Sequence, residues 1–449
     1  MDTSLLTAES AAKSVGEIIE DARLGPVHWW TLVFCALIAA LDGFDVLVMA
    51  FAAPVLAQQW TLDSRHIGFL LGAAPIGMAL GAATIAPLAD KVGRKHLLML
   101  ACGLAGIGTL ASAFTASVWP LGATRLITGL GIGTALPTLT TLTSEISPDR
   151  WRNLFISIVT NGYSVGTITG AIVAGSIIHT LGWQGLFWFG GVGPLLLIPF
   201  LWACLAESPH YYAGSRRAGS KENLAKVLEK LYGKTVVLRS EEGQTSTGER
   251  MLGVGRLLAG NLRQATLMSW IAFFCSFFVV YFIFQWIPTI IHSAGYSLDD
   301  AFRASLVASV GGLLGPFAVA GLSRYVSLQR SIVIFFVLGG LGTALIGAAG
   351  QSLALIVTLI FLSSFFTLGA EMGLFMFTAR LYPTSARAGG VGWALGVGRF
   401  GAIFGPIVGG FLIGMGGGAP FYFPLFGAAL IVAALAIHRS RFRGDSFAI

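Results

Sequence analysis

Long runs of apolar residues alternate with short polar segments along almost the whole chain of 449 residues. Each run has about 20 residues or more, enough for a helix that rises 1.5 Å per residue to cross a hydrocarbon core about 30 Å thick. The pattern predicts twelve membrane-spanning helices, at about 29–56, 66–88, 96–115, 119–146, 154–179, 184–205, 266–291, 300–322, 331–349, 353–380, 390–414 and 420–437. We therefore expect an all-α polytopic membrane protein.

One long polar segment interrupts this series and divides the spans into two groups of six. Inside it, the stretch from Lys221 to Tyr232 has the pattern of a short amphipathic helix. Asp63 and Ser297 come just before the second and eighth spans, where they would cap the helix N-termini. The predicted order is a tail, a six-helix bundle, a central loop, a second six-helix bundle and a tail, at 1–28, 29–206, 207–264, 265–438 and 439–449.

The basic residues lie almost entirely on one side of the predicted membrane. Of the 28 lysines and arginines, all but four fall in the tails, the central loop or loops on the same side. Arg65 and Arg303 fall on the other side, and Arg125 and Arg399 lie within spans. Because basic loops remain in the cytoplasm, we expect both termini and the central loop to be cytoplasmic.

Composition excludes an ordinary soluble domain. Hydrophobic residues make up 55% of the chain and charged residues only 11%, whereas soluble domains carry about 25% charge. The net charge of +7 does not indicate a nucleic-acid partner, because it comes from loops that flank the membrane. The four cysteines lie in apolar segments without metal-ligand spacing, so we expect no disulfide and no metal site. No phosphate-binding loop is visible, and we expect no cofactor.

The two halves of the chain repeat each other at an offset of 235 residues. The shift superposes residues that punctuate the spans and loops, namely Pro148 on Pro383, Arg152 on Arg387, Gly166 on Gly401, Gly170 on Gly405 and Lys95 on Arg330. Six-helix halves related by an axis along the membrane normal are the architecture of the major facilitator superfamily. We expect that fold.

Two aspartates, Asp42 and Asp45, stand in the middle of the first span. A carboxylate at this depth is costly unless it faces a cavity or a partner, and is therefore a candidate functional group. Their spacing places both on one face of a helix, and two neighbouring acids in a low dielectric do not both ionise easily. We expect them to carry protons. The alternative is a buried pair satisfied by helix-end or loop groups.

Two arginines within spans are candidate ligands for an anionic substrate. Arg125 begins the pattern Arg-x-x-x-Gly-x-Gly, and its natural partner is Asp42 or Asp45, unless it extends to the outer surface. Arg399 lies near mid-membrane among glycines that open space around it. Arg399 either attracts an anion or pairs with Glu371, an acid within the tenth span that is a third candidate proton carrier.

Four further residues at similar depth are candidates for contact with a ligand. Trp286 could stack on a flat molecule, although simple packing is the alternative interpretation for any single aromatic ring in this chain. Gln285, Asn161 and Tyr163 are polar side chains that could form hydrogen bonds to a ligand.

The loop after the second span resembles the cytoplasmic loop motif of the major facilitator superfamily, Gly-x-x-x-Asp-Arg/Lys-x-Gly-Arg-Arg/Lys. The resemblance implies a latch that holds one access state, with Asp90 pairing across the two halves; the alternative is charge that serves membrane topology alone. Ala86 replaces the first glycine, and Tyr325 replaces the acid in the second copy, so a latch would exist only in the first half. The candidate latch residues are Asp90, Gly93, Arg94, Lys95, Glu145 and Arg152.

The motifs together resemble those of the aromatic acid/proton symporters, the branch of the superfamily that includes 4-hydroxybenzoate/protocatechuate, benzoate and muconate transporters. The resemblance covers about Val27 to Ala436 and rests on Asp42-Gly-Phe-Asp45, the Asp90–Lys95 loop, Ser144-Glu145-x-x-Pro148, and Tyr382-Pro383-Thr384 leading to Gly398-Arg399-Phe400-Gly401. It implies uptake of an aromatic carboxylate with protons, by alternating access, by a monomer in the bacterial inner membrane. Glu371 is not part of the family pattern.

Other functions remain as alternatives. Glu207-Ser208-Pro209 resembles a sugar-porter motif, so a porter for a sugar, a polyol or a non-aromatic organic acid is the nearest rival. A drug/proton antiporter is disfavoured because two arginines in the cavity would repel cations. A membrane sensor or an enzyme finds no support, since the sequence offers no metal cluster, no nucleophile with a base and no soluble signalling domain.

Overall fold

The computed structural model describes residues 15–20, 24–214, 220–232, 254–258, 262–382 and 384–440. All of the regular secondary structure in these ranges is helical. Eleven helices in the described ranges are long and apolar enough to cross a membrane, which confirms the prediction of an all-α polytopic protein. Pro383, used above in the repeat and in the family motif, lies outside the described residues, as do parts of the tails and of the central loop.

The long helices follow the predicted spans. Those of the first half are α3 Pro26–Gln59, α4 Ser64–Leu80, α6 Arg94–Ser112, α7 Val118–Ile146 and α8 Asp149–Cys204. Those of the second half are α12 Leu262–Ser293, α13 Leu298–Leu322, α14 Leu328–Ile346, α15 Leu353–Leu381, α16 Thr384–Gly414 and α17 Ala419–Arg439.

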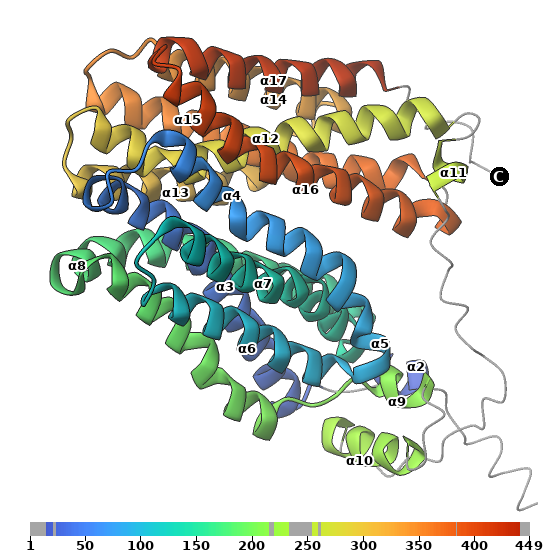
Figure 1. Cartoon of the computed structure of the whole chain (residues 1–449). Coiled ribbons are helices and arrows are strands. Elements are labelled where there is room, and N and C mark those ends of the chain that lie inside the picture. The colour runs from blue at the N-terminus through green and yellow to red at the C-terminus, as the bar shows by residue number, and fades with distance from the viewer. Residues whose placement is uncertain are drawn as a thin grey trace, which may run out of the picture.

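Short helical elements occupy the tail, the central loop and the connection after α4. They are α2 Val15–Glu20, a π-helical turn Gly81–Ile85, a 3-10 turn Ala86–Leu88, α5 Ala89–Val92, α9 Pro209–Gly214, α10 Ser220–Tyr232 and α11 Val254–Leu257. The amphipathic helix predicted near Lys221 to Tyr232 is α10. Helices α2, α9, α10 and α11 lie at one end of the molecule, which we call the central-loop end (Figure 1).

Helix α8 contains a reversal of the chain. Its 56 residues would make a straight helix about 84 Å long, far longer than a membrane is thick. At Gly182 the backbone has φ 69° and ψ −173°, a conformation that residues with a side chain avoid, and α8 turns back on itself (Figure 1). This break falls between the two spans predicted at 154–179 and 184–205.

Both predicted N-caps are present. The Asp63 carboxylate accepts a hydrogen bond of 2.9 Å from the backbone N–H of His66, and the Ser297 hydroxyl accepts one of 3.1 Å from the backbone N–H of Asp300. Such caps satisfy amide groups that have no partner within the helix. The bond from His66 holds the pKa of Asp63 below its usual value.

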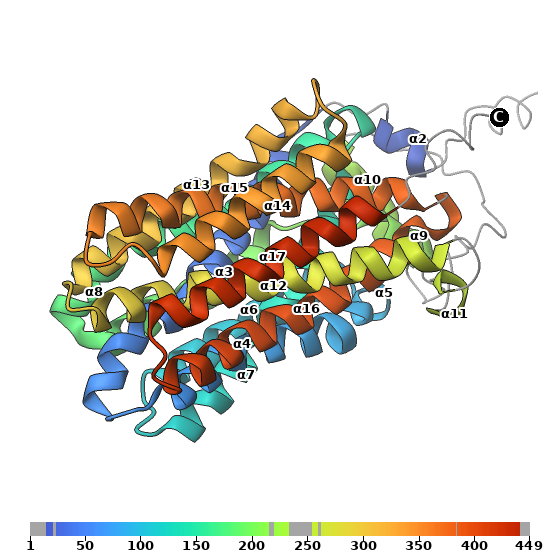
Figure 2. The ribbon, with the colours of Figure 1, turned by 90° about the horizontal axis from the view of Figure 1, so that it is seen from above.

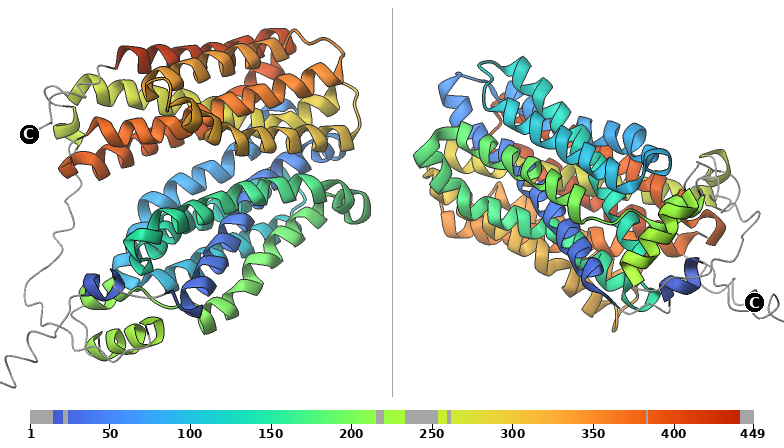
Figure 3. Two further views of the ribbon diagram at one scale, coloured as in Figure 1. Left: turned by 180° about the vertical axis from the view of Figure 1, so that it is seen from behind. Right: turned by 90° about the horizontal axis from the view of Figure 1, so that it is seen from below.

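The helices form two groups that correspond to the two halves of the sequence. Helices α3 to α10 make one group and α11 to α17 the other, one lying over the other in the view of Figure 1 and from behind in Figure 3. Seen from above, α16 of the second group lies beside α4 of the first (Figure 2). The groups meet where α4 packs on α16, α8 on α13, and α3 on α12.

Glycines let the backbones of paired helices touch. A Cβ on Gly43 of α3 would collide with the backbone carbonyl of Tyr163 in α8, and one on Gly166 of α8 would collide with the carbonyl of Ala40. On α7, a Cβ on Gly129 or Gly133 would collide with carbonyl groups of α4. Without a hydrophobic force between helices in lipid, close packing of this kind is a main source of association.

Glycines that correspond to each other in the two halves allow the same close helix contact in each half. Gly166 packs on α3, the first span of its half, and Gly401 packs on the carbonyl of Phe274 in α12, the first span of the second half. The offset of 235 residues found in the sequence therefore corresponds to equivalent helix contacts.

Substitution of Gly43 by Val should destabilise the protein. The side chain has to push α8 away from α3 next to both aspartates, which should cost about 1–3 kcal/mol and lower the apparent Tm of the protein in detergent. Gly396→Ala is the matched control, because a Cβ at this helical glycine meets nothing within 4 Å. Equal melting temperatures for Gly43→Val and Gly396→Ala would contradict the packing argument.

Candidate functional site

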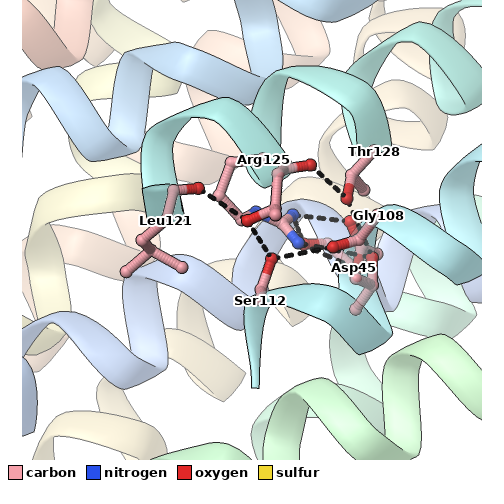
Figure 4. A network of polar contacts seen from close by, with 8 residues as sticks. Asp45, Gly108, Ser112, Leu121, Arg125 and Thr128 are labelled. Carbon is pink, nitrogen blue, oxygen red and sulfur yellow. Dashed lines mark hydrogen bonds and ion pairs between the residues drawn. The ribbon is translucent and has the colours of Figure 1, made fainter. Parts of the chain in front are cut away.

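Asp45 of α3 and Arg125 of α7 form an ion pair inside the first group of helices (Figure 4). Arg125 Nη2 donates to Asp45 Oδ2 at 2.6 Å, and Thr109 of α6 donates to Asp45 Oδ1 at 2.6 Å. Arg125 is fully buried and Asp45 is 3% exposed, so neither charge contacts water. Of the two aspartates predicted as partners of Arg125, the ion pair uses Asp45.

Hydroxyl groups surround this ion pair. Arg125 Nη1 donates to the Thr109 oxygen at 3.3 Å, and Thr109 lies 3.2 Å from the hydroxyl of Thr128. One turn along α6, Ser112 donates to Thr124 at 2.8 Å (Figure 4). The guanidinium therefore lies in a polar lining built by α3, α6 and α7, which compensates its loss of water.

Asp42 lies one helical turn from Asp45, toward the central-loop end. It is 4% exposed, and its Oδ2 atom has no hydrogen-bond partner among the described residues. A buried carboxylate without a partner is costly when charged. The two aspartates therefore occupy different environments, one fully paired and one not.

A cavity of about 480 Å³ lies between the two groups of helices. It is lined by α3, α4, α7 and α8 of the first group and by α12, α13, α15 and α16 of the second. Much of its wall is aromatic or aliphatic, with Phe277, Phe284, Phe317 and Phe375 among the lining residues. The volume falls in the range of about 300–1,000 Å³ that is usual for small-molecule sites.

Arg399 and Glu371 are the only charged side chains among the residues that line this cavity. The Ser276 hydroxyl donates to Glu371 Oε2 at 3.1 Å. Tyr281 of α12 lines the cavity together with Arg399 and Glu371. Among the described residues no carboxylate is within 4.0 Å of the Arg399 guanidinium, in contrast to Arg125.

Five of the predicted site residues line the cavity: Asn161, Tyr163, Gln285, Glu371 and Arg399. Asp42, Asp45 and Arg125 are not among the lining residues, so the predicted contact of Arg125 with a ligand has no support in this arrangement.

Trp286 also lies away from the cavity lining. It is fully buried, and its Nε1 donates to the backbone carbonyl of Pro406 in α16 at 2.9 Å. The structure therefore matches the packing interpretation of this ring rather than stacking on a ligand. Asn161 lines the cavity, but its amide donates to the backbone carbonyl of Ser157 at 2.8 Å.

Sequence reasoning missed two polar cavity contacts on α12. Tyr281 lines the cavity together with Arg399 and Tyr163, and Ser276 binds Glu371. A signal was present, because Tyr281 precedes Gln285 by four residues and so shares its helix face.

A second polar network lies at the central-loop end, around the α5–α6 turn. Arg94 binds Asp90 at 2.8 Å and Glu145 of α7 at 2.9 Å. Gly93, with φ 102°, makes the turn between α5 and α6. Glu145, one of the candidate latch residues, thus contacts this loop, but Asp90 pairs within its own half rather than across to the other one.

Glu207 holds the start of α6 in this network. It is 4% exposed, and its carboxylate accepts hydrogen bonds from the backbone N–H groups of Arg94 at 2.8 Å and Lys95 at 3.1 Å. A carboxylate at a helix N-terminus is favoured by the free amides and the helix dipole. The Lys95 side chain donates to the carbonyl of Trp202 in α8 at 2.6 Å.

Arg152 at the start of α8 has contacts of its own. It forms an ion pair with Asp149 and donates to the backbone carbonyl of Ser144 at 3.1 Å. These contacts stabilise the connection between α7 and α8, next to the Arg94 network.

The two groups of helices contact each other directly at the opposite end. Gln58 of α3 lies 2.8 Å from His292 of α12, and His179 of α8 lies 3.2 Å from Asp299 of α13. On the neighbouring face, Arg65 of α4 lies over the ring of Phe411 in α16 at 5.6 Å. These contacts hold the two groups together at this end.

Comparisons with known proteins agree with this architecture. The family model described as Major Facilitator Superfamily matches residues 33–376. The inward-open xylose transporter XylE from E. coli has the same fold, with a TM-score of 0.73 at 18% identity over 92% of this chain and 96% of that chain.

Relatives by sequence are transporters of aromatic acids. The gallate transporter of Pseudomonas putida is 35% identical over 423 residues, 94% of each chain. The 4-hydroxybenzoate transporter PcaK of Pseudomonas aeruginosa is 36% identical over 406 residues, 90% of each chain. These relatives are transporters and not enzymes, and the chain is a multi-pass protein of the bacterial inner membrane. It belongs to the major facilitator superfamily, in the branch that holds these aromatic acid transporters.

Proposed function

We propose that the protein takes up an aromatic carboxylate together with protons, by alternating access. The observation that carries the proposal is Arg399, a cation without an ion-pair partner among the described residues, in a cavity with otherwise largely apolar walls. The relatives that transport gallate and 4-hydroxybenzoate support an aromatic acid as the substrate class.

The two mid-membrane arginines have different roles in this proposal. Arg125 is neutralised by Asp45 and enclosed by hydroxyl groups, so it has little to offer an incoming anion. Arg399 lines the cavity with its guanidinium free of carboxylates, and a guanidinium fork matches the two oxygens of a carboxylate. The substrate carboxylate therefore binds Arg399.

The cavity walls suit a flat aromatic ring. Phe277 and Phe284 of α12, Phe317 of α13 and Phe375 of α15 line the same space as Arg399. Aromatic pairs prefer offset or edge-to-face contacts and gain beyond the area that they bury. A charge at one end of an aromatic chamber is the arrangement that an aromatic carboxylate requires.

Proton coupling uses the acids near the cavity. A substrate carboxylate on Arg399 arrives close to Glu371, and two carboxylates in a low dielectric repel each other, so Glu371 takes up a proton. Asp42 and Asp45 form the second proton site. Protonation of Asp45 releases Arg125, and the unpaired Oδ2 of Asp42 provides a neighbouring acceptor.

The proposal includes a membrane topology. Helix α8 counts as two crossings because it reverses at Gly182, which gives twelve crossings in two bundles, 29–206 and 265–438. The basic loops support a cytoplasmic position for both termini and for the central loop, 207–264. The proposal also includes that the protein works as a monomer.

The contacts at the two ends indicate which access state this is. Contacts across the groups close the end opposite the central loop, whereas the Arg94 network at the central-loop end joins elements of the first group alone. We therefore assign an inward-facing state. The latch around Asp90 and Arg94 then acts on the first group, as a rigid support for the start of α6.

The motif behind the sugar-porter alternative lies away from the cavity. Glu207, part of the motif that suggested it, caps α6 at the central-loop end and is not among the residues that line the cavity. The likeness to the xylose transporter is at 18% identity and concerns the fold alone.

Uptake by the purified protein in liposomes tests the function directly. A panel of labelled benzoate, hydroxybenzoates, protocatechuate, gentisate and muconate, with a sugar as control, is measured with and without an inward proton gradient. We expect an aromatic acid to accumulate only with the gradient. Sugar uptake, or acid flux indifferent to the gradient, would contradict the proposal.

Arg399→Gln should abolish measurable binding of the aromatic acid. Loss of a charge partner in a desolvated site costs about 2–5 kcal/mol, whereas Arg399→Lys should retain part of the affinity. Arg303→Gln, which removes an exposed arginine of α13 outside the cavity, is the matched control. Binding by Arg399→Gln at wild-type affinity in a titration would rule out this role.

Asp45→Asn should abolish accumulation driven by the proton gradient. It also leaves Arg125 as an unpaired buried charge, a loss of about 3–5 kcal/mol. The double variant Asp45→Asn with Arg125→Gln removes that charge, and should regain stability without regaining coupling. Gradient-driven accumulation close to the wild-type level by Asp45→Asn would show that Asp45 is not the proton carrier.

A further inference from the structure

The amide of Gln285 is buried at the cavity with its carbonyl oxygen unsatisfied. Gln285 is 1% exposed, it lines the cavity, and its Oε1 atom has no hydrogen-bond partner among the described residues. Folded proteins pair nearly all buried polar groups, and an unpaired one loses the hydrogen bond that water would have supplied. An unsatisfied amide at a cavity therefore points to a ligand group that completes it.

Four other polar side chains of the cavity lining form hydrogen bonds within their own helices. Each of the following donates to a backbone carbonyl three or four residues earlier: Thr160 to Ile156, Asn161 to Ser157, Thr167 to Ser164 and Ser309 to Ser305. Gln285 forms no such bond, so, unlike these four side chains, its amide oxygen is left for a ligand.

The position of Gln285 along α12 relates it to the anion site. Gln285 lies one helical turn, about 6 Å along the axis, from Tyr281, and both line the same cavity as Arg399. Ser276, which binds Glu371, lies on the other side of Tyr281 along the same helix. A ring whose carboxylate binds Arg399 therefore shares this cavity with the amide of Gln285.

The cavity has room for a substituted benzoate, because its volume is about 480 Å³. Phe284, next to Gln285 in sequence, also lines the cavity and offers an apolar surface to the ring.

We infer that Gln285 recognises a hydroxyl group on the ring of the substrate, so that the cavity selects hydroxylated aromatic carboxylates over unsubstituted ones. A phenolic hydroxyl donates to the amide oxygen and accepts from the amide nitrogen, so it pairs with Gln285 in either orientation of the amide. Benzoate would leave this amide unpaired in a closed site, which is the kind of mismatch that a binding site rejects strongly. The inference rests on the proposed function, because it assumes that the carboxylate binds Arg399.

The test compares ligands that differ only in the ring hydroxyl. Binding of benzoate, 3-hydroxybenzoate, 4-hydroxybenzoate and 3,4-dihydroxybenzoate is titrated on the full-length protein in detergent, for the wild type and for Gln285→Leu. We expect the wild type to prefer a hydroxylated acid by about tenfold or more. Gln285→Leu should lose about tenfold in affinity for that acid and leave benzoate binding unchanged.

Two further variants make the comparison decisive. Gln264→Leu makes the same substitution near the start of α12, outside the cavity, and should keep the wild-type preference. Gln285→Asn withdraws the amide by one methylene and should reduce the preference too, which provides a second measurement if Gln285→Leu does not fold. Retained benzoate binding shows that a variant is folded.

The outcomes separate this inference from the proposed function. If the wild type binds benzoate and the hydroxybenzoates equally, or if the Gln285 variants weaken all four acids alike, Gln285 does not recognise the hydroxyl, and the proposed function stands. If the wild type binds none of the four acids, the inference is wrong; if it also accumulates no acid of the liposome panel, the proposed function is wrong too.

Discussion

Every charge inside a membrane needs compensation, and the way each charge is compensated explains most of this structure. Arg125 is paired with Asp45 and enclosed by hydroxyl groups, while Arg94 is paired with Asp90 and Glu145 at the central-loop end. Arg399 alone among these three has no carboxylate partner within the described residues. Since an uncompensated cation in low dielectric is costly, an anion that enters the cavity would supply the charge partner that Arg399 lacks among the described residues.

Glycines allow the helices to approach closely enough for these charges to meet their partners. Gly43 lies between the two aspartates, at the point where the backbone of α8 touches α3. The glycines that follow Arg125 similarly bring α7 against α4 and α6. The sequence motifs of the two helices therefore combine a charge with the small residues that set its distance from the next helix.

Hydropathy was sufficient to locate the helices, because the length of a span and its polar ends are local properties. Even the reversal in α8 was visible, as the gap between two predicted spans. Partners across helices were harder to predict. Asp42 and Asp45 differ by one turn, and the depth at which α7 crosses α3 decides between them. Neighbouring Gln285 and Trp286 face a cavity and a packed helix respectively, because consecutive residues point about 100° apart.

The π-helical turn at Gly81–Ile85 changes the register of the chain between two fixed contacts. Before it, Gly77 packs against α7; after it, Arg94 binds Glu145 of α7 together with Asp90. A π turn accommodates one residue more than an α turn, so it shifts the chain that follows by one residue. A chain one residue shorter in this turn would preserve the glycine contact and displace the Asp90–Arg94 pair as a unit from Glu145. The irregular turn thus lets the connection after α4 reach two separate contact points on α7.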